Sequence, residues 1–457
     1  ALVERPNVLV GQFEEAFLEV PQECLILTMK ANQKYFPLLR DAPAILDGAR
    51  QVAQGKLTNR FLIVSNISPD DASAVVQGNE RVVRPRLADA KFFFDQDRKK
   101  TLESRVPGLA KVVYHNKLGS QGERVERVRA IARWVAEKVD ADVRLADRAA
   151  LLAKVDLLTD MVGEFPELQG VMGGYYARHD GEDEAVAQAI ADQYLVRRDE
   201  TEAVTNLVSE VLQIADRMET LVGIWGIGLK PTGDKDPFAL RRHALSVIKS
   251  FQLLGLKSAQ DKAGLRLDLD DLIAFSLSVF PAGSLAGNVA EELKLFIYER
   301  YANQLTPLFG AEAVAAVFAG MPPLHEIVKR LRAVSEFAQL PESPSLAAAN
   351  KRVGNILKKA EGEAGGAVNA ALFVETAETA LFAALSGIAP RADAAFAAGD
   401  YTASLQALAA LKAPVDAFFD QVMVNADDPA LKANRLALLH RLHQTMNRVA
   451  DLSRLAA

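Results

Sequence analysis

The strand-forming patterns of this 457-residue chain all lie within its first 67 residues. Three short runs there are rich in large apolar residues and are bounded by Gly, Pro or Asn, which is typical of strands: NVLVGQF, ECLILTMK and RFLIVSNI. From Ser68 onward, apolar residues recur at spacings of three and four, which is the period of an amphipathic helix. Pro85 is expected to break the first of these helices or to begin a turn. The pattern predicts a mainly α protein with a small N-terminal α+β element.

The chain is too long for one hydrophobic core, since domains average about 150 residues. The charged, non-periodic stretch KSAQDKAGLRLDLDD follows residue 256 and indicates a boundary. We predict four segments: a partial α+β domain (1–70), a helical domain (71–256), a helical linker or start of a bundle (257–345) and a helical bundle (346–457).

The composition of the chain argues against several classes of protein. Cys24 is the only cysteine, which excludes an intramolecular disulfide and favours a reducing, cytoplasmic location. No apolar run is long and uncharged enough to suggest a membrane span, and the start has no secretory-signal pattern. The chain does not begin with Met, so we expect its first residues to lie inside a longer protein. The net charge of −6 gives no global argument for nucleic acid, and we expect no DNA partner; any nucleic-acid site would be local.

His179 and Asp180 are adjacent, as in a large superfamily of metal-dependent phosphohydrolases. Their surroundings, ARHDGEDE, are polar and lead into a glycine, which favours a helix entry with Asp180 as N-cap. The helical pattern resembles that superfamily elsewhere, but ALLAKVDLLTDMV carries Lys154 in the helix that would hold the metal-binding pair, and an ammonium there would repel a cation. Only Asp216 stands in an expected ligand setting. We predict no metal site; the alternative is a phosphohydrolase using His179, Asp180 and Asp216.

Motifs for nucleotide binding and nucleophilic catalysis are missing from the sequence. GIWGIGLK falls short of a phosphate-binding P-loop because no Ser or Thr follows Lys230. No GxSxG motif occurs, and the histidines have no obvious nucleophile partner. We predict no catalytic residue in this chain. The Gly-rich segment is interpreted as an exposed loop in which Trp225 anchors a protein interface.

Positive charge gathers on two helical stretches near the C-terminus. NKRVGNILKKA buries Val353, Ile356 and Leu357 on one side and places its basic residues about two turns apart. The last helix is basic within an acidic chain, and Asn434, Arg441 and Arg448 recur every seven residues on nearly one face. Two such helices side by side would form a phosphate-binding surface. A merely solvated basic face is an equally weighted alternative, and a helical scaffold without any nucleic-acid role is a third.

Five long stretches, in register from about residue 6 to the C-terminus, resemble the bacterial glycyl-tRNA synthetase β-subunit family. They are VPQECLILTMKANQKYFPL, GNERVVRPRLADAKFFFDQDRKK, LLAKVDLLTDMVGEFPELQGVMGGYYA, GDKDPFALRRHAL and VDAFFDQVMVNADDPALKANRLALLHRL. The resemblance implies that the N-terminal region usual in that family is missing from this sequence. The resemblance implies a degenerate HD-like helical domain without metal ligands over 71–256 and an anticodon-binding-type bundle over 346–457.

The resemblance also implies an activity and partners. Members of that family form a complex of two alpha and two beta subunits that attaches glycine to tRNA(Gly), and the alpha subunit holds the glycine, ATP and Mg²⁺. This chain is then expected to bind tRNA, to hold no cofactor and to lack catalytic activity alone. The predicted tRNA-binding residues are Lys351, Arg352, Lys358, Lys359, Asn434, Arg435, Arg441 and Arg448.

Overall fold

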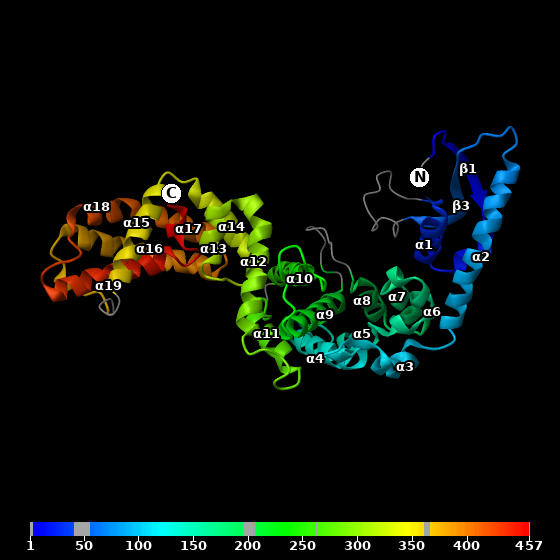
Figure 1. Cartoon of the computed structure of the whole chain (residues 1–457). Helices are drawn as coiled ribbons and strands as arrows, with labels where there is room; N and C mark the ends of the chain where they lie inside the picture. Colours follow the sequence, from blue (N-terminus) through cyan, green and yellow to red (C-terminus); the bar gives the residue numbers. More distant parts are fainter. Residues whose placement is uncertain are drawn as a thin grey trace. The chain divides into compact units, whose positions relative to one another are not determined.

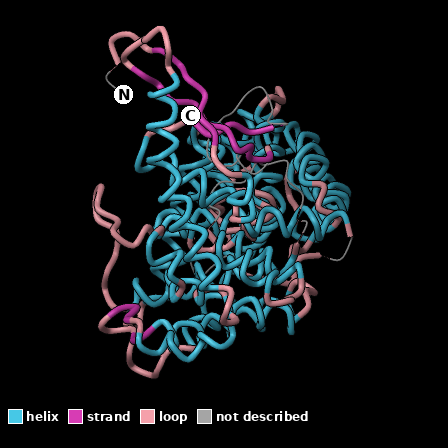
Figure 2. The backbone as a smooth tube through the Cα atoms, turned by 90° about the vertical axis from the view of Figure 1, so that its right-hand side faces the viewer, coloured by secondary structure: helices cyan, strands magenta, loops and turns pink. Residues whose placement is uncertain are grey.

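The computed structural model describes residues 3–40, 55–194, 204, 206–261, 264–360 and 366–456. The chain consists of two compact units. Unit 1 comprises residues 1–229 and 275–286, and unit 2 comprises residues 230–274 and 287–457. Helices dominate both units, and within the described ranges every named strand precedes residue 121 (Figure 1, Figure 2). The prediction of a mainly α protein with a small N-terminal sheet is confirmed.

The N-terminal sheet of unit 1 has three antiparallel strands in the order β1-β3-β2. They are β1 (Asn7–Gln12), β2 (Phe36–Arg40) and β3 (Lys56–Ser65). Leu62 on β3 pairs with Val10 on one side and Phe36 on the other. Phe61 is fully buried beneath Gly11, where a Cβ would lie 2.7 Å from the phenyl ring. A side chain at this position would therefore force the ring to move.

Two local predictions in this region are wrong. ECLILTMK was predicted as a strand, but it forms most of helix α1 (Gln22–Gln33). Cys24, Leu25 and Met29 are buried in that helix at a spacing that places them on one helical face. Pro85 does not break the chain either, because it lies inside α2 (Ser73–Asp97) on the exposed side, where its ring meets solvent.

The rest of unit 1 is a helical domain with a small hairpin. The hairpin consists of β4 (Val113–His115) and β5 (Gly119–Ser120). The α-helices are α3 (Leu102–Arg105), α4 (Gln121–Lys138), α5 (Val143–Leu152), α6 (Asp160–Glu164), α7 (Val171–His179), α8 (Glu184–Asp192) and α9 (Leu207–Gly226). Every residue of α9 after Leu207 is buried, and α4, α5 and α8 pack against it. Helix α9 is therefore the centre of this domain.

Short 3-10 helices connect several elements in unit 1: η1 (Glu15–Glu19), η3 (Val106–Lys111), η4 (Val155–Leu158) and η5 (Pro166–Leu168). Helix α11 (Leu269–Ser278) is divided between the units. Helix α10 (Leu240–Gln260) belongs to unit 2, whereas the predicted segment 71–256 included most of it. The four predicted segments themselves stay predictions.

Unit 2 continues as helices packed around an apolar core. They are α12 (Val289–Phe309), α13 (Ala311–Phe318), α14 (Ile327–Ala338), α15 (Ser343–Lys359), α16 (Thr376–Ala397), α17 (Tyr401–Ala407), α18 (Lys412–Gln421) and α19 (Pro429–Met446), with 3-10 turns η6 (Ala370–Leu372), η7 (Leu408–Leu411) and η8 (Leu452–Leu455). Helix α19 packs between α15 and α16. Tyr301, Phe337 and Phe418 are among the fully buried side chains of unit 2. Among the described helices of either unit, none is long and apolar enough to cross a membrane.

Candidate nucleic-acid interface

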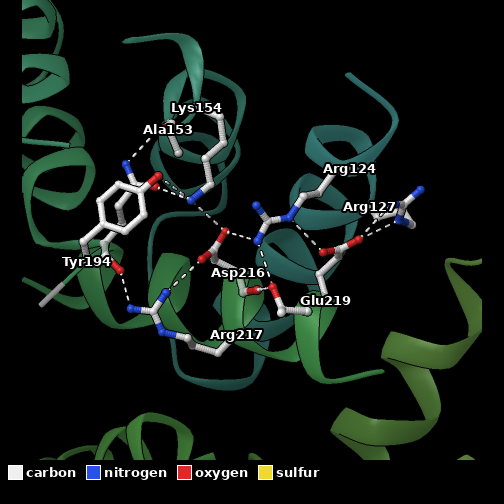
Figure 3. A network of polar contacts seen from close by, with 10 residues as sticks. Arg124, Arg127, Ala153, Lys154, Tyr194, Asp216, Arg217 and Glu219 are labelled. Carbon is white, nitrogen blue, oxygen red and sulfur yellow. Dashed lines mark hydrogen bonds and ion pairs between the residues drawn. The ribbon is translucent and has the colours of Figure 1, made fainter. Parts of the chain in front are cut away.

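A buried network of charges lies at the centre of unit 1, around Asp216 on α9 (Figure 3). One carboxylate oxygen of Asp216 lies 3.0 Å from Lys154 Nζ and 3.0 Å from Arg124 Nη2, and the other lies 2.9 Å from Arg217 Nη1. One turn later, Glu219 bridges Arg124 at 2.9 Å and Arg127 at 2.8 Å. All six side chains are at least nine-tenths buried, so these ion pairs are shielded from water.

The Lys154 ammonium is surrounded by oxygen atoms. It donates to Gln193 Oε1 at 2.7 Å and to the Tyr194 hydroxyl at 3.1 Å, and it lies 4.4 Å from the centre of the Tyr194 ring. Burial alone would raise the pKa of Asp216, but the three neighbouring cations hold it well below its usual range. The carboxylate is therefore ionised and fully occupied by side chains of its own chain.

These residues do not fit a metal ion. Both oxygens of Asp216 are taken by cations, and within the described residues no group of three or more His, Cys, Asp and Glu side chains could hold a metal. His179 is exposed and accepts a hydrogen bond from Arg98, while Asp180 accepts one from the Leu102 backbone N–H at 2.7 Å. The donor set required by the phosphohydrolase alternative is not assembled.

The predicted role of Asp180 as an N-cap is also wrong. Helix α7 ends at His179, and Asp180 follows it as the C-cap. The N-cap of α8 is Asp183, whose side chain accepts from the Ala185 backbone N–H at 2.8 Å. Gly181, with φ of +82°, turns the chain between these two helices.

Trp225 was expected in an exposed loop, and this expectation is wrong. The residue lies in the last turn of α9, and only 7% of its surface is exposed. The loop begins after it, at Ile227. The partner contact predicted for Trp225 stays a prediction, without an exposed aromatic surface to support it.

The predicted basic residues of α15 are all on its exposed side, whereas Val353 is buried beneath them. Arg352 lies over the ring of Phe419 from α18, with its guanidinium carbon 4.3 Å from the ring centre. Arg441 on α19 lies 5.1 Å from the centre of Phe382, and Arg448 lies 5.0 Å from that of Phe396. Three predicted arginines of unit 2 therefore rest on phenylalanine rings supplied by other helices. The sequence contains no signal for these pairings, because the rings lie far away along the chain.

Asn434 and Arg435 differ from the other predicted residues, because each is only 5% exposed. Arg435 donates to Glu378 Oε1 at 2.9 Å and to the Met423 carbonyl at 2.7 Å. Asn434 exchanges two hydrogen bonds with the backbone of Asn369, at 2.7 and 3.0 Å. These contacts tie α19 to α16 and to neighbouring loops, so the structure places both side chains in the interior of the bundle.

Two clefts open beside the end of α19, and sequence reasoning missed both. The first cleft, of about 750 Å³, is lined by residues from α13, α14, α15 and the end of α19, including Lys351, Lys358 and His443. The second cleft, of about 680 Å³, lies between α16 and α19 and includes Arg441 and Gln444. Asn447 and Arg448 line both clefts. Burial lowers the pKa of His443, which favours the neutral form of its imidazole.

Comparison with protein families accounts for nearly the whole chain. Residues 1–319 match the sequence model of the glycyl-tRNA synthetase beta subunit. The chain belongs to this family. Residues 346–453 match a second model, the DALR anticodon binding domain. The resemblance predicted from the sequence is therefore confirmed.

Curated relatives bear the same family name. The chain is 64% identical over 461 residues to the glycine–tRNA ligase beta subunit of Thiobacillus denitrificans, 61% over 463 to that of Delftia acidovorans and 59% over 461 to that of Methylobacillus flagellatus. These alignments cover 100% of this chain but 62–63% of each relative. This member of the family thus spans about three fifths of their length.

The two charged features of the chain lie in ranges that match different family models. The buried network around Asp216 lies within the part matched by the beta-subunit model. All eight predicted tRNA-binding residues lie within the part matched by the anticodon-binding model. Of these eight, the six other than Asn434 and Arg435 keep exposed surface.

Proposed function

We propose that this chain is the tRNA-binding part of a glycine–tRNA ligase beta subunit. It works in the cytoplasm in a complex of two alpha and two beta subunits, where the alpha subunit binds glycine, ATP and Mg²⁺. The chain binds tRNA(Gly) and is not catalytic alone. Family membership and the names of the relatives support this role. The observation that carries it is the set of ring-supported arginines, exposed at Arg352 and Arg448 and half-buried at Arg441, in the part that matches an anticodon-binding domain.

An arginine that rests on an aromatic ring is well suited to bind phosphate. The ring contact fixes the plane of the guanidinium group and leaves the N–H groups on its edge available as a fork for phosphate oxygens. Lys351, Lys358 and Lys359 add exposed point charges on the neighbouring helix. Since the chain as a whole carries a net charge of −6, attraction of RNA depends on this local concentration of cations.

For the helical part of unit 1, we propose an HD-like domain in which a side-chain cation stands where related folds hold a metal. Lys154 supports this proposal, because its ammonium is enclosed by the carboxylate of Asp216, the amide oxygen of Gln193 and the hydroxyl of Tyr194. The role of this domain is then to support the fold rather than to catalyse hydrolysis.

The test is the salt dependence of tRNA(Gly) binding by the full chain. Each phosphate contact contributes about 0.7–0.9 to the slope of log K against log salt concentration, so Arg352→Ala and Arg441→Ala are each expected to reduce the slope by about that amount. Arg144→Ala is the matched control, because Arg144 is an exposed arginine on α5, outside the proposed surface. If all three variants bound equally well, the proposed surface would be wrong. Glycylation is expected only after the alpha subunit is added.

A further inference from the structure

We infer that Arg330, on α14, is a positioning residue for RNA binding and that it acts through Arg448. It contacts both the backbone beside Arg448 and the phenylalanine ring on which Arg448 lies. Phosphate binding by Arg448 is part of the proposed function, on which this inference rests. Residue 330 lies between the two ranges that match family models, 1–319 and 346–453. Neither match therefore assigns Arg330 a role.

The guanidinium group of Arg330 is mostly buried and makes three kinds of contact. Its Nη2 atom donates to Glu326 Oε2 at 2.6 Å, one turn earlier along the chain. Its Nη1 atom donates to the carbonyl of Val449 at 3.1 Å, in the turn that follows α19. Its central carbon lies 5.2 Å from the centre of the Phe396 ring and 4.9 Å from that of Tyr401. The side chain is 11% exposed, so most of its surface is already used within the protein.

Arg448 is the exposed counterpart of Arg330 on the same ring. Its guanidinium carbon lies 5.0 Å from the centre of Phe396, and its Nε atom lies 3.3 Å from Asp393 Oδ1. Its side chain is 47% exposed. Each of the two arginines has its own carboxylate, Glu326 or Asp393, which lowers the repulsion between their charges. One ring therefore supports a mostly buried cation and an exposed one.

The turn after α19 places Arg448, because the helix ends before it. At the start of the turn, Asn447 exchanges two hydrogen bonds with Asn350, at 2.8 and 3.0 Å. At its end, the Asp451 backbone N–H donates to a carbonyl of α13 at 2.9 Å. Between these fixed ends, Arg330 supplies the hydrogen bond to the residue after Arg448. Loss of Arg330 should therefore free Arg448 locally without releasing the turn from the bundle.

Positioning of this kind strengthens binding without a new contact to the ligand. A guanidinium group that is held in place loses less conformational entropy when it binds a phosphate. The planar fork of Arg330 can reach Glu326 and Val449 at once, whereas a lysine at the same place would keep the charge but not the fork. Arg330→Lys therefore separates the positioning effect from the effect of charge.

The test is a double-mutant cycle on the affinity of the full chain for tRNA(Gly) at one fixed salt concentration. Its four proteins are the unmodified chain, Arg330→Lys, Arg448→Ala and the double variant. If Arg330 acts through Arg448, its substitution has nothing to disturb once the Arg448 side chain is removed. Arg330→Lys is expected to weaken binding about threefold in the unmodified chain, within the range for coupled residues, and to have no measurable effect in the Arg448→Ala background.

The matched control is Arg332→Lys, because Arg332 is exposed on α14 and is absent from the linings of both clefts. It should leave the affinity unchanged. Phe396→Leu removes the shared ring without a change of charge, and it should reproduce both the loss of affinity and its dependence on Arg448. Thermal unfolding checks that each variant is folded; if Arg330→Lys is not, Phe396→Leu decides by the same criteria.

Two results would overturn the positioning role. Equal weakening by Arg330→Lys in both backgrounds would mean that Arg330, which lines the first cleft, acts independently of Arg448, and no weakening in either would mean that it does not act on binding at all. A normal affinity of Arg448→Ala would also overturn the role, and the proposed function would stand if Arg352→Ala still weakened binding. If neither Arg448→Ala nor Arg352→Ala changed the affinity, the proposed function itself would fail.

Discussion

In unit 1, the guanidinium groups of Arg124 and Arg217 contact a buried carboxylate, whereas in unit 2 those of Arg352 and Arg441 lie over phenylalanine rings and keep surface exposed to solvent. The difference is one of solvation. A buried cation has lost its water and depends on its carboxylate partner, so its removal or that of its partner destabilises the fold. An arginine on a ring at the surface keeps part of its water, and its N–H groups stay available for an outside anion. The two arrangements predict opposite results for substitutions.

The largest effect on stability is expected for Asp216→Ala. This change leaves Lys154, Arg124 and Arg217 buried without their shared carboxylate, which should lower the free energy of unfolding by about 3–5 kcal/mol. Urea unfolding of the full chain measures it. The control is Asp95→Ala, which breaks a partly exposed pair with Lys91 and should cost at most about 1 kcal/mol. Equal losses in the two variants would refute the distinction.

Arg435→Ala should be the next most damaging change, although Arg435 lies on the same helix as Arg441. It removes a buried partner of Glu378 and the hydrogen bond to the Met423 carbonyl, for a loss of about 3 kcal/mol. Arg441→Ala is the matched variant and should leave the unfolding midpoint nearly unchanged while weakening tRNA binding. Thermal unfolding and tRNA affinity, measured on both proteins, should rank them in opposite orders.

Asp156 is a buried carboxylate with fewer cationic partners than Asp216, and its effect on stability should depend on pH. Burial raises its pKa to about 6, although its Oδ2 accepts hydrogen bonds from the backbone N–H groups of Gly170 and Gly173. Since this pKa is above the unfolded value of about 4, the folded state binds the proton more tightly. Below pH 4 the protonated group makes its full contribution to the free energy of unfolding. That contribution, on the order of 2–3 kcal/mol, is lost as the pH rises through 6. Asp156→Asn should remove this loss. If the difference in free energy of unfolding between the two proteins stayed the same across pH 4–7, the prediction would be contradicted.

The smallest effect on stability is expected for Arg352→Ala. A cation–π contact at an exposed site contributes about 0.5–1 kcal/mol, so the midpoint of thermal unfolding should fall only slightly. Differential scanning fluorimetry measures this shift. A loss as large as that of Arg435→Ala would mean that Arg352 is part of the core of the bundle and not of a binding surface.

The sequence predicted the helical character, the family and the basic helices, because these depend on periodicity and on long local matches. It could not separate Arg435 from Arg441, since the partner that buries Arg435 is Glu378, 57 residues away. The seven-residue spacing of Asn434, Arg441 and Arg448 was also misleading. Helix α19 ends at Met446, so Arg448 is placed by the following turn and not by helical periodicity.

Short apolar segments were the other source of error. ECLILTMK has the composition of a strand, and only its packing through Cys24, Leu25 and Met29 makes it a helix. Trp225 was placed in a loop because three glycines lie within six positions of it, yet Gly223 and Gly226 lie inside α9. Gly226 is required there because a Cβ would lie 2.7 Å from Leu285. Close packing against a segment 59 residues later gives no local signal.

The ammonium of Lys154 has a consequence for how unit 1 is maintained in a cell. A divalent ion at the centre of a domain has to be acquired after synthesis and can be lost by dilution or to a chelator. The cation beside Asp216 is synthesised with the polypeptide, in a ratio of one per chain, and cannot dissociate. Assembly of this charged core is therefore independent of competition for metals among proteins.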